Sequence, residues 1–286
     1  MLVLVTGGGP ATATVRGLVR SAHVERPGRV VLVETDGPVA VVDGEPHVVI
    51  RDGVVSVPRL RRAVSEVDGT LTGTVLVTGG TGALGRRVAR HLRDVHGVEV
   101  VLASRSGVPV DGFEVVACDV ADRDQVAALL AARPVDAVVH CAGVLDDGVI
   151  ESLTPERLER VLRPKVDGAR NLDELVDGPL VLFSSTAGVL GSAGQANYAA
   201  ANTYLDALAE DRRSRGLPAV SIAWGWWDDA EGMVGGLSDG DRERIARTGV
   251  RPLDPERALA LFDAALGHGA PVLVAARLEP RRAAPV

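Results

Sequence analysis

A glycine-dense turn directly after an apolar strand constrains this chain more than any other feature. Residues 74–78 (Thr-Val-Leu-Val-Thr) are β-branched or apolar, and a helix-like segment follows the turn at residues 86–93. Gly80, Gly82 and Gly85 fit the fingerprint G-x-G-x-x-G, whose glycines permit a tight turn, close approach of a pyrophosphate and packing of helix on strand. N–H groups at the helix start, with the helix dipole, stabilise phosphates. We therefore predict a dinucleotide site at Thr78, Gly79, Gly80, Gly82, Ala83, Leu84 and Gly85.

The next strand indicates which dinucleotide the site takes. Residues 98–103 (Val-Glu-Val-Val-Leu-Ala) form an almost continuous apolar run, typical of a buried parallel strand, and Ser104, Arg105 and Ser106 follow it. NAD sites usually carry an acidic residue at this strand end, whereas arginine suits the 2′-phosphate of NADP. We predict NADPH as the cofactor. The alternative is that Arg105 is only a solvated surface side chain.

A third strand, expected at residues 113–118, ends at Asp119 and Val120. Asp119 is well placed to contact the adenine ring of the cofactor. It is equally compatible with a role as the cap of the following helix, because aspartate is a preferred N-cap residue.

From residue 73 onward, strands and helices alternate at short intervals. Two helix openings are explicit, because Thr154-Pro155-Glu156 and Asp254-Pro255-Glu256 combine an N-cap residue with proline at the first helical position. This alternation predicts an α/β fold with a doubly wound parallel sheet covered on both faces. The expected strands are residues 74–78, 98–103, 113–118, 135–140, 179–184, 219–224 and 271–276.

Residues 1–72 have a different pattern. Five short strand-like runs, separated by glycine and proline, are expected at residues 2–6, 30–34, 39–42, 47–50 and 54–57, with one helix near Ala13 to His23. The early sequence Val5-Thr6-Gly7-Gly8-Gly9 imitates the later fingerprint but lacks its third glycine, and Pro10 interrupts it. We predict a structural, non-binding segment here, and two domains, 1–72 and 73–286.

Bulk properties exclude several function classes. The net charge of −7 argues against nucleic acid or an anionic membrane as a partner, and no apolar stretch is long enough to span a bilayer. No signal peptide is recognisable, so we expect a cytoplasmic protein. Cys118 and Cys141 lie in apolar strand contexts, which favours reduced thiols over a disulfide. No metal site is expected.

Chemically informative residues follow the fourth and fifth strands. Ser184-Ser185 ends a strand, Tyr198 lies thirteen residues after Ser185 at the start of a small-residue helix, and His140-Cys141-Ala142-Gly143 follows the strand before. This arrangement resembles the short-chain dehydrogenase/reductase family, whose fold is of the Rossmann type. The resemblance implies that Ala142 and Gly143 contact the cofactor. Most members carry lysine four residues after the tyrosine, but Asn202 stands there in this chain.

Exchange of that lysine and asparagine is characteristic of ketoreductase domains of modular type I polyketide synthases. Pro164-Lys165-Val166-Asp167-Gly168-Ala169 resembles their lysine segment, and Trp224-Gly225-Trp226-Trp227 and residues 249–256 are further matches. Residues 1–72 resemble only the later part of the structural subdomain that precedes the catalytic one, so we expect a truncated N-terminal subdomain. The expected partners are neighbouring synthase domains and an acyl carrier protein bearing a phosphopantetheine-tethered β-ketoacyl chain.

The resemblance implies a mechanism for reduction of the β-carbonyl group. Tyr198 is the expected general acid, and an unperturbed phenol titrates near pH 10, so a nearby cation is expected to lower its pKa. Lys165 is the candidate cation and also a candidate to hold the nicotinamide ribose. Ser185 is expected to hydrogen-bond the carbonyl oxygen, and Asn202 to order the lysine or a water in a proton relay. Each of the four could instead have an ordinary structural role.

The stereochemical outcome is also implied by resemblance. Leu145-Asp146-Asp147 matches the signature of B-type ketoreductases, which form D-configured alcohols, although both aspartates could merely cap the next helix. Leu190 stands where A-type domains carry tryptophan, and Ala200 stands where an epimerising domain carries proline, which favours the B1 subtype. Residues 226–237 are expected to form a lid. The expected substrate and stereocontrol residues are Leu145, Asp146, Asp147, Leu190, Gln195, Trp227 and Met233. For the tryptophans of residues 224–227, a role in the core is an equal alternative.

Two other functions remain open from the sequence. The first is a free-standing reductase of the same superfamily that acts on a diffusible ketone. The second is a redox-inactive domain that binds the cofactor and acts as a scaffold or an epimerase.

Overall fold

The computed structural model describes residues 2–6, 9–64, 67–228 and 249–279, and in the first of these ranges only the backbone is described. Within these ranges, the larger part of the chain is built on a parallel sheet whose strand order is β7-β6-β5-β8-β9-β10-β12. The strands are β5 (Thr74–Thr78), β6 (Glu99–Ser104), β7 (Glu114–Ala117), β8 (Ala137–His140), β9 (Leu180–Ser185), β10 (Ala219–Trp224) and β12 (Val272–Ala275).

This sheet is doubly wound, as the sequence predicts. All its neighbouring strands pair in parallel, and the order reverses between β5 and β8, where a ligand crevice is expected. The strands are buried almost without interruption, as expected for a parallel sheet covered on both faces. A short antiparallel pair, β11 (Val250–Arg251) with β13 (Arg277–Leu278), adjoins the sheet. Each of the seven strands predicted from residue 74 onward lies within two residues of its expected position.

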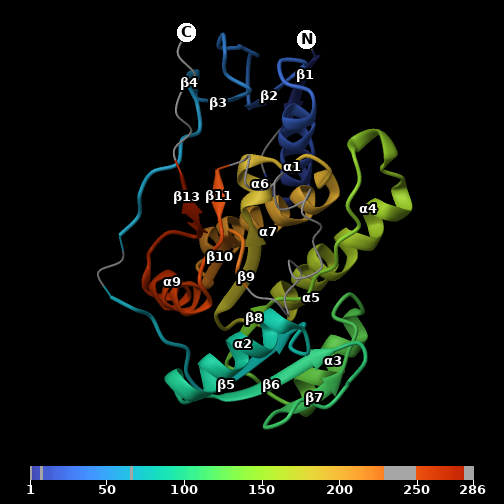
Figure 1. Ribbon diagram of the computed structural model, residues 1–286, viewed down its shortest axis with the longest axis vertical. Helices are drawn as coiled ribbons and strands as arrows, with labels where there is room; N and C mark the ends of the chain where they lie inside the picture. The colour runs from blue at the N-terminus through green and yellow to red at the C-terminus, as the bar shows by residue number, and fades with distance from the viewer. Residues whose placement is uncertain (1, 7–8, 65–66, 229–248, 280–286) are drawn as a thin grey trace.

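Helices cover both faces of the sheet (Figure 1). Thr154 and Asp254 cap α4 and α9 as predicted, because each side chain accepts a hydrogen bond from backbone N–H groups of the first turn. The helices are α2 (Ala83–His91), α3 (Arg123–Ala132), α4 (Pro155–Leu162), α5 (Gly168–Leu175), α6 (Thr186–Leu190), α7 (Ala196–Ser214) and α9 (Pro255–Gly267). Single π-helical turns continue α2 at residues 92–96 and join α4 to α5 at residues 163–167, and a short 3₁₀ turn spans residues 150–152.

The N-terminal part forms a second sheet of strand order β1-β2-β3-β4. Its elements are β1 (Leu2–Thr6), α1 (Pro10–Glu25), β2 (Val30–Thr35), β3 (His47–Arg51) and β4 (Val54–Ser56). The strand predicted at residues 39–42 is wrong. Val39, Val41 and Val42 are exposed, and no strand in the described part of the chain lies beside this apolar run to pair with it.

The two parts meet where α1 crosses α7 (Figure 1). A Cβ atom at Gly17 would lie 2.3 Å from the carbonyl oxygen of Ala199, so only glycine lets the two helix backbones approach this closely. The sheet lies on one side of α7, and the helices α1, α4 and α6 pack against its other sides. Because α7 is surrounded in this way, many of its buried side chains are small alanines. No helix in the described residues is long and apolar enough to cross a bilayer.

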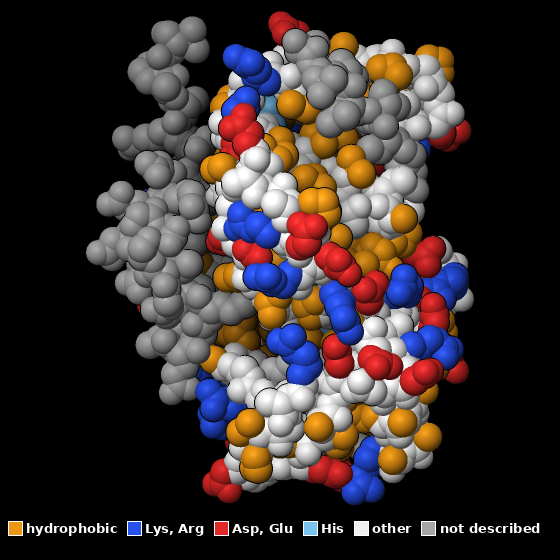
Figure 2. All heavy atoms as spheres, turned by 90° about the vertical axis from the view of Figure 1, so that its right-hand side faces the viewer, with side chains coloured by type: hydrophobic (Ala, Val, Ile, Leu, Met, Phe, Trp, Pro, Cys, Tyr) orange, Lys and Arg blue, Asp and Glu red, His pale blue; other side chains and the backbone are white. Residues whose placement is uncertain are grey.

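Charged side chains are intermixed on the surface that carries α3 and α4, where arginines and carboxylates alternate (Figure 2). Several of them pair, for example Arg123 with Glu174 and Arg170 with Asp167. Exposed pairs of this kind contribute little to stability, but they leave this face without a single dominant sign of charge.

Candidate active site

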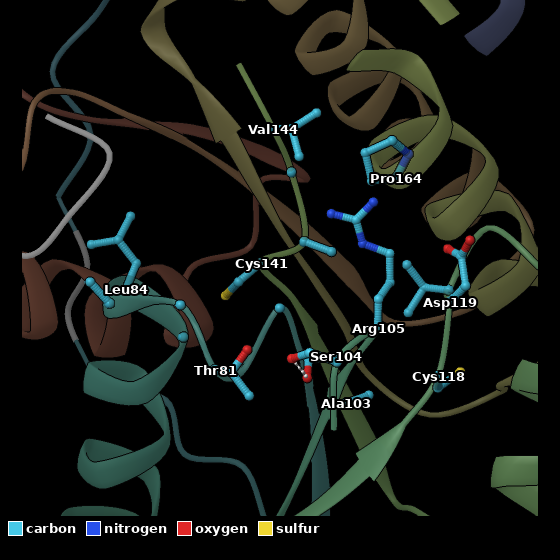
Figure 3. A pocket seen from close by; sticks show the side chains of 18 residues that line it. Thr81, Leu84, Ala103, Ser104, Arg105, Cys118, Asp119, Cys141, Val144 and Pro164 are labelled. Atoms are coloured by element: carbon cyan, nitrogen blue, oxygen red, sulfur yellow. Dashed lines mark hydrogen bonds between the residues drawn. The ribbon is translucent and has the colours of Figure 1, made fainter. Parts of the chain in front are cut away.

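A cleft of about 630 Å³ lies over the carboxyl ends of β5, β6 and β8, at the point where the strand order reverses (Figure 3). The turn after β5 forms one wall, the residues after β6 and β7 form a second, and the segment after β8 closes the end. Its lining residues are Gly79, Thr81, Gly82, Ala83, Leu84, Gly85, Ala103, Ser104, Arg105, Ser106, Cys118, Asp119, Val120, Cys141, Ala142, Gly143, Val144 and Pro164.

The turn is built so that no side chain fills it. Gly79 has a φ of 66°, a conformation that favours glycine, and its carbonyl oxygen accepts a hydrogen bond from Gly82 N. A Cβ atom at Gly85 would lie 2.4 Å from that same carbonyl oxygen. The first N–H groups of α2 have no intrahelical acceptor, so they face the open cleft as anion donors. This arrangement fits the pyrophosphate of a dinucleotide.

The cleft contains all the predicted cofactor residues except Thr78 and Gly80. Thr78 is fully buried, and its hydroxyl is 2.7 Å from Nδ1 of His140. Gly80 faces away from the cleft, since a Cβ atom there would meet the side chain of Leu102 at 2.8 Å. These two residues shape the turn from below and do not line the cavity. The sequence analysis did not identify Thr81, Ala103, Cys118, Cys141, Val144 and Pro164, which flank the motif residues.

Arg105 and Asp119 stand on the same wall of the cleft (Figure 3). Arg105 is exposed and has no ion-pair partner among the described residues. Asp119 is engaged, because its Oδ2 accepts a hydrogen bond from Arg163 at 3.0 Å and its Oδ1 accepts one from Ala121 N at 3.1 Å. It does not cap α3, whose N-cap is Asp122. An unpaired guanidinium beside this crevice suits an additional phosphate.

Lys165 connects the cleft to a second group of polar residues. Its side chain is 3 % exposed and belongs to the π-helical turn 163–167. Nζ donates a hydrogen bond to Phe183 O at 2.7 Å, and a Cβ atom at Gly143 would lie 2.8 Å from Lys165 Cε. Burial lowers the pKa of Lys165 to about 8, against the opposing effects of Cys141 and Asp206. The ammonium group therefore lies against the inner end of the cleft.

Tyr198 lies on the other side of Lys165. Lys165 Nζ is 5.6 Å from the centroid of the Tyr198 ring, and the ring packs with Leu145 and Ala187 in a small apolar cluster. Asn202 Nδ2 donates a hydrogen bond to Tyr198 O at 2.9 Å, one helical turn back. Ser185 ends β9 and caps α6 through a hydrogen bond from Ala187 N. The structure thus gathers all four predicted catalytic residues at one place.

The expected net lowering of the Tyr198 pKa is wrong. Burial raises the pKa of Tyr198, and side-chain hydrogen bonds with Asn202 and Ser185 only partly oppose it, while the charge of Asp147 adds to the rise. The ammonium group of Lys165 lies over the face of the ring, 5.6 Å from its centroid, and donates to Phe183 O. The phenol consequently keeps its proton at neutral pH.

The sequence analysis gave no role to His140, which is fully buried between the turn and the lysine. Its Nε2 is 3.2 Å from Lys165 O, and its Nδ1 faces the Thr78 hydroxyl. Burial and the charge of Lys165 lower the pKa of His140 to about 3, so the ring is neutral. A neutral ring that donates to Lys165 O and accepts from Thr78 fixes the lysine backbone to the strand before the turn.

The segment Leu145-Asp146-Asp147 forms a loop beside Tyr198. Arg157 holds it, since Nε donates to Asp146 Oδ1 at 2.9 Å and Nη2 donates to Asp147 O at 2.6 Å. Gln195 Nε2 donates to Asp147 Oδ2 at 2.9 Å, three residues before the tyrosine. Neither aspartate caps a helix, because Val149 and Thr154 precede the next two helical segments. The alternative of a capping role is therefore excluded.

One cluster outside the cleft contains possible metal ligands. His91, His96 and Asp263 place their ligand-type atoms within 4.8 Å of one another. Leu71 N donates to His96 Nδ1 at 3.1 Å, so the ring proton is on Nε2, which faces Asp263 Oδ1 at 2.9 Å. Metal binding at that nitrogen would leave the ring with no proton at all. Hydrogen bonds between α9 and the end of α2 account for the cluster.

Comparisons with known proteins agree with this geometry. Residues 73–229 match the family model described as the KR domain, and residues 2–60 match the Rossmann fold domain of the polyketide synthase extender module SpnB. The chain belongs to the KR domain family. It is a ketoreductase domain similar to those of modular type I polyketide synthases, and thus an oxidoreductase of a family whose Rossmann domain binds a nicotinamide cofactor.

Individual relatives extend the similarity over almost the whole chain. Polyketide synthase GfsE of Streptomyces halstedii is 51% identical over 298 residues, which cover 94% of this chain and 8% of that protein. The first ketoreductase of the tylosin polyketide synthase is 36% identical, with a TM-score of 0.84, 97% of this chain covered and 70% of that one. The ketoreductase from the first module of phoslactomycin biosynthesis in Streptomyces sp. HK803 is 35% identical, with a TM-score of 0.87, 97% of this chain covered and 76% of that one.

Among the residues expected to contact the substrate, Leu190 and Trp227 lie elsewhere in the structure, and Met233 is outside the described residues. Leu190 lines a second cavity of about 470 Å³, which α1 and the N-terminal sheet also line. Trp227 is 3 % exposed and packs edge-on against Trp224, with ring centroids 4.9 Å apart, so it belongs to the core and the prediction of a substrate contact is wrong. Met233 and most of the expected lid lie outside the described residues.

Proposed function

We propose that this ketoreductase uses NADPH to reduce the β-keto group of a chain tethered to an acyl carrier protein, forming a D-configured β-hydroxyl group. The observation that carries the proposal is the position of Lys165. Its side chain lies against Gly143 at the inner end of the cofactor cleft and over the ring of Tyr198. A reduced nicotinamide in the cleft and a ketone beside the phenol would meet there.

NADPH rather than NADH is favoured by the residues after β6. Arg105 is exposed on the cleft wall without an ion-pair partner in the described part of the chain, and Ser104 and Ser106 flank it with hydroxyl groups. Guanidinium and hydroxyl groups donate hydrogen bonds, which suits the 2′-phosphate of NADPH. An acidic residue, which would accept from the ribose hydroxyls of NADH, does not stand at this strand end.

The protein residues supply the proton and stabilise the developing charge. NADPH, when bound, provides the hydride that adds to the carbonyl carbon. Tyr198, kept protonated by burial, donates its phenolic proton to the oxygen as negative charge grows there. The Ser185 hydroxyl donates a hydrogen bond to the same oxygen, a contribution of roughly 3 kcal/mol for a preorganised donor. Lys165 holds a positive charge beside the phenol as the proton leaves.

Asn202 is proposed to sustain the proton supply. Its Oδ1 is buried and has no hydrogen-bond partner among the described residues, while its Nδ2 is bound to the helix backbone. A buried acceptor of this kind is satisfied by a bound water. Such a water would link Tyr198 to the outside and restore its proton after each reaction.

The stereochemical proposal rests on the Leu145-Asp146-Asp147 loop. Arg157 and Gln195 fix this loop beside the tyrosine, so it can restrict the side from which the tethered chain enters. The small Ala200 on α7 and Leu190 in place of tryptophan favour the non-epimerising B1 subtype. The carrier-bound substrate is proposed because the relatives are polyketide synthases, of which this chain spans less than a tenth in the case of GfsE.

Reduction of a β-ketoacyl thioester, presented on an acyl carrier protein and as a short thiol mimic, tests the proposal through NADPH consumption and chiral analysis of the alcohol. Tyr198→Phe should lower turnover by about 10²- to 10⁴-fold while NADPH binding stays unchanged. Tyr204→Phe on the same helix is the matched control, because that ring packs in a different core cluster.

Each other outcome rejects a defined part. No turnover by the unaltered protein would favour the redox-inactive alternative, and better turnover of simple ketones would favour a free-standing reductase. An L-configured alcohol would reject the B-type assignment alone.

A further inference from the structure

One face of α1 lies on the elements that carry the catalytic residues. Gly17, Ser21 and Glu25 are spaced by four residues and therefore share this face. Gly17 permits the close contact with α7, and the fully buried Ser21 hydroxyl accepts a hydrogen bond from Ser192 N at 3.2 Å. Arg20, one position away, donates to Gly188 O at 2.7 Å. Helix α1 thus contacts the backbone within α6 and just after it.

Glu25 makes the most specific of these contacts. Its Oε1 accepts a hydrogen bond from Gly194 N at 2.8 Å, and its Oε2 accepts one from Ile150 N at 3.0 Å. One half-buried carboxylate therefore binds two loops that are more than forty residues apart in the chain. Hydrogen bonds from backbone N–H groups to a charged acceptor are stronger than neutral ones and fix direction as well as distance.

Both loops adjoin the residues proposed to control reduction. Ile150 follows Asp146 and Asp147 within the same loop, and Gly194 precedes Tyr198 by four residues. The loops also touch each other directly, because Gly148 N donates to Gly194 O at 2.7 Å. Gly194 has a φ of 78°, which favours glycine and makes this turn a defined conformation. Glu25 closes the arrangement from the outside by holding one N–H of each loop.

We propose that Glu25 is a positioning residue for substrate binding and stereocontrol, contributed by the N-terminal subdomain. It holds the loop after Asp147 and the loop before Tyr198 at a fixed separation, and so sets the width of the substrate entrance. The proposal rests on the proposed function of these two loops. It extends the role of the N-terminal subdomain beyond general support, because one carboxylate acts on two defined amides.

The neighbouring residue provides a matched comparison. Arg26, at the end of α1, also reaches across to the same loop, through an ion pair with Glu151. That pair is exposed, with 51% and 66% of the two side chains accessible, and exposed pairs contribute little. Loss of Arg26 therefore removes a contact between the same two elements without freeing a backbone N–H group.

The test compares Glu25→Ala, Glu25→Gln and Arg26→Gln in the full chain. Glutamine keeps one acceptor oxygen and replaces the other by an NH₂ group, which cannot accept from an N–H group. Amide hydrogen exchange at Gly194 and Ile150 should accelerate about tenfold or more in Glu25→Ala, and at one of the two amides in Glu25→Gln, since each loses a charge-assisted bond. Exchange in β5, β6 and β7 should stay unchanged, which shows that the variants are folded.

Activity gives the second readout. In Glu25→Ala the KM for the thioester and the share of the minor alcohol isomer should rise, while the affinity for NADPH stays within about twofold. Unchanged exchange at both amides, or equal changes in Arg26→Gln, would overturn the proposal. If the unaltered protein reduces no thioester, the proposed function fails, but the exchange measurement still decides whether Glu25 holds the two loops.

Discussion

Two strand–helix–strand units of the same topology serve different purposes in this domain. In the cofactor unit, β5, α2 and β6 surround an open cleft, and in the N-terminal unit, β1, α1 and β2 form a parallel pair with a connecting helix. Both helices begin after glycine, at Gly9 and at Gly82. The early turn itself lies partly outside the described residues, at 7–8, so its predicted failure to bind a dinucleotide stays a prediction.

The ends of the second strands differ most clearly. In the cofactor unit, β6 ends at Ser104, and the exposed Arg105 after it carries an unpaired charge on the cleft wall. In the N-terminal unit, Glu34 near the end of β2 is buried, and its carboxylate lies 2.7 Å from Nε2 of His47 and 3.2 Å from Nη1 of Arg16. The charge that could meet a ligand is free in one unit and neutralised within the protein in the other.

The helices are used differently as well. The start of α2 faces the cleft, whereas α1 turns its small residues toward α7 and its polar residues toward the catalytic loops. A strand–helix–strand unit can therefore be recruited for packing once its strand-end charge is paired. The fold alone does not determine which role a unit has; the residues at the strand end and on the helix face do.

A change in the glycine turn after β5 should have the largest effect on cofactor affinity. Gly85→Ala places a Cβ atom 2.4 Å from Gly79 O, so the turn must move, although alanine is the better helix former. We expect NADPH to bind at least about a hundredfold more weakly, as measured by fluorescence titration, which corresponds to ~3 kcal/mol. Gly269→Ala, with open space around its Cβ, is the control. Unaltered affinity in Gly85→Ala would show that the turn does not cradle the cofactor.

Removal of the unpaired charge of Arg105 should have the next largest effect on cofactor affinity. Arg105→Ala should weaken NADPH by about thirtyfold, or ~2 kcal/mol, because a hydrogen-bonded charge pair is lost, and should leave NADH nearly unchanged. Paired titrations with both cofactors provide the measurement. Arg133→Ala is a suitable control, since that arginine pairs with Glu114 on the surface. Equal losses for both cofactors would reject the phosphate contact and remove this difference between the two units.

Gly17→Ala tests the packing role of the N-terminal unit. The new Cβ atom would meet the backbone of Ala199 at 2.3 Å, so α1 must separate from α7. Overpacking costs about 1–3 kcal/mol, and the better helix propensity of alanine offsets up to about 1 kcal/mol of it. We expect a lower unfolding temperature with NADPH affinity retained, compared with Gly37→Ala, whose Cβ lies in open space. A stability equal to that of the control would show that the helices do not depend on this contact.

The sequence predicted the elements that follow local rules and missed those that depend on long-range contacts. Strand periodicity located the catalytic sheet, and the capping residues Thr154 and Asp254 located two helix starts, because both signals lie within a few residues. The run at residues 39–42 has the same local composition, but whether it pairs depends on a neighbouring strand that no local signal reveals. The roles of Glu25 and His140 depend on partners far along the chain.

The same division between local signals and long-range contacts applies to the candidate active site. The family resemblance predicted that Ser185, Tyr198, Asn202 and Lys165 lie together, and the structure places them near one another, while their catalytic roles stay predictions. The direction of the Tyr198 pKa shift could not be predicted, because it depends mainly on the burial of the ring, which only the fold reveals. Trp227 was misassigned for a related reason: a tryptophan after a strand suits a lid or a core equally well until its packing partner is known.

The smallest expected effect concerns the neutralised charge of the N-terminal unit. Burial raises the pKa of Glu34, but the hydrogen bond with His47 and the charges of Arg16, His47 and Arg20 outweigh it, so the pKa is lowered overall. Arg51 also faces the carboxylate, at 3.8 Å. Because the folded-state pKa lies below the unfolded value of about 4.3, this stabilisation is complete above that pH and is lost as the pH falls through the folded-state value.

Glu34→Gln should therefore lower the unfolding temperature by about 2–3 °C at neutral pH, as expected for a loss of ~1 kcal/mol, and the difference from the unaltered protein should shrink below about pH 4. Thermal melts at a series of pH values measure this. Glu45→Gln, which removes a surface pair with Arg59, should change little at any pH. A difference between Glu34→Gln and the unaltered protein that does not depend on pH would mean that the side chain acts through packing and not through its charge. The contrast between a free and a neutralised strand-end charge would then not explain why only one of the two units is expected to bind a cofactor.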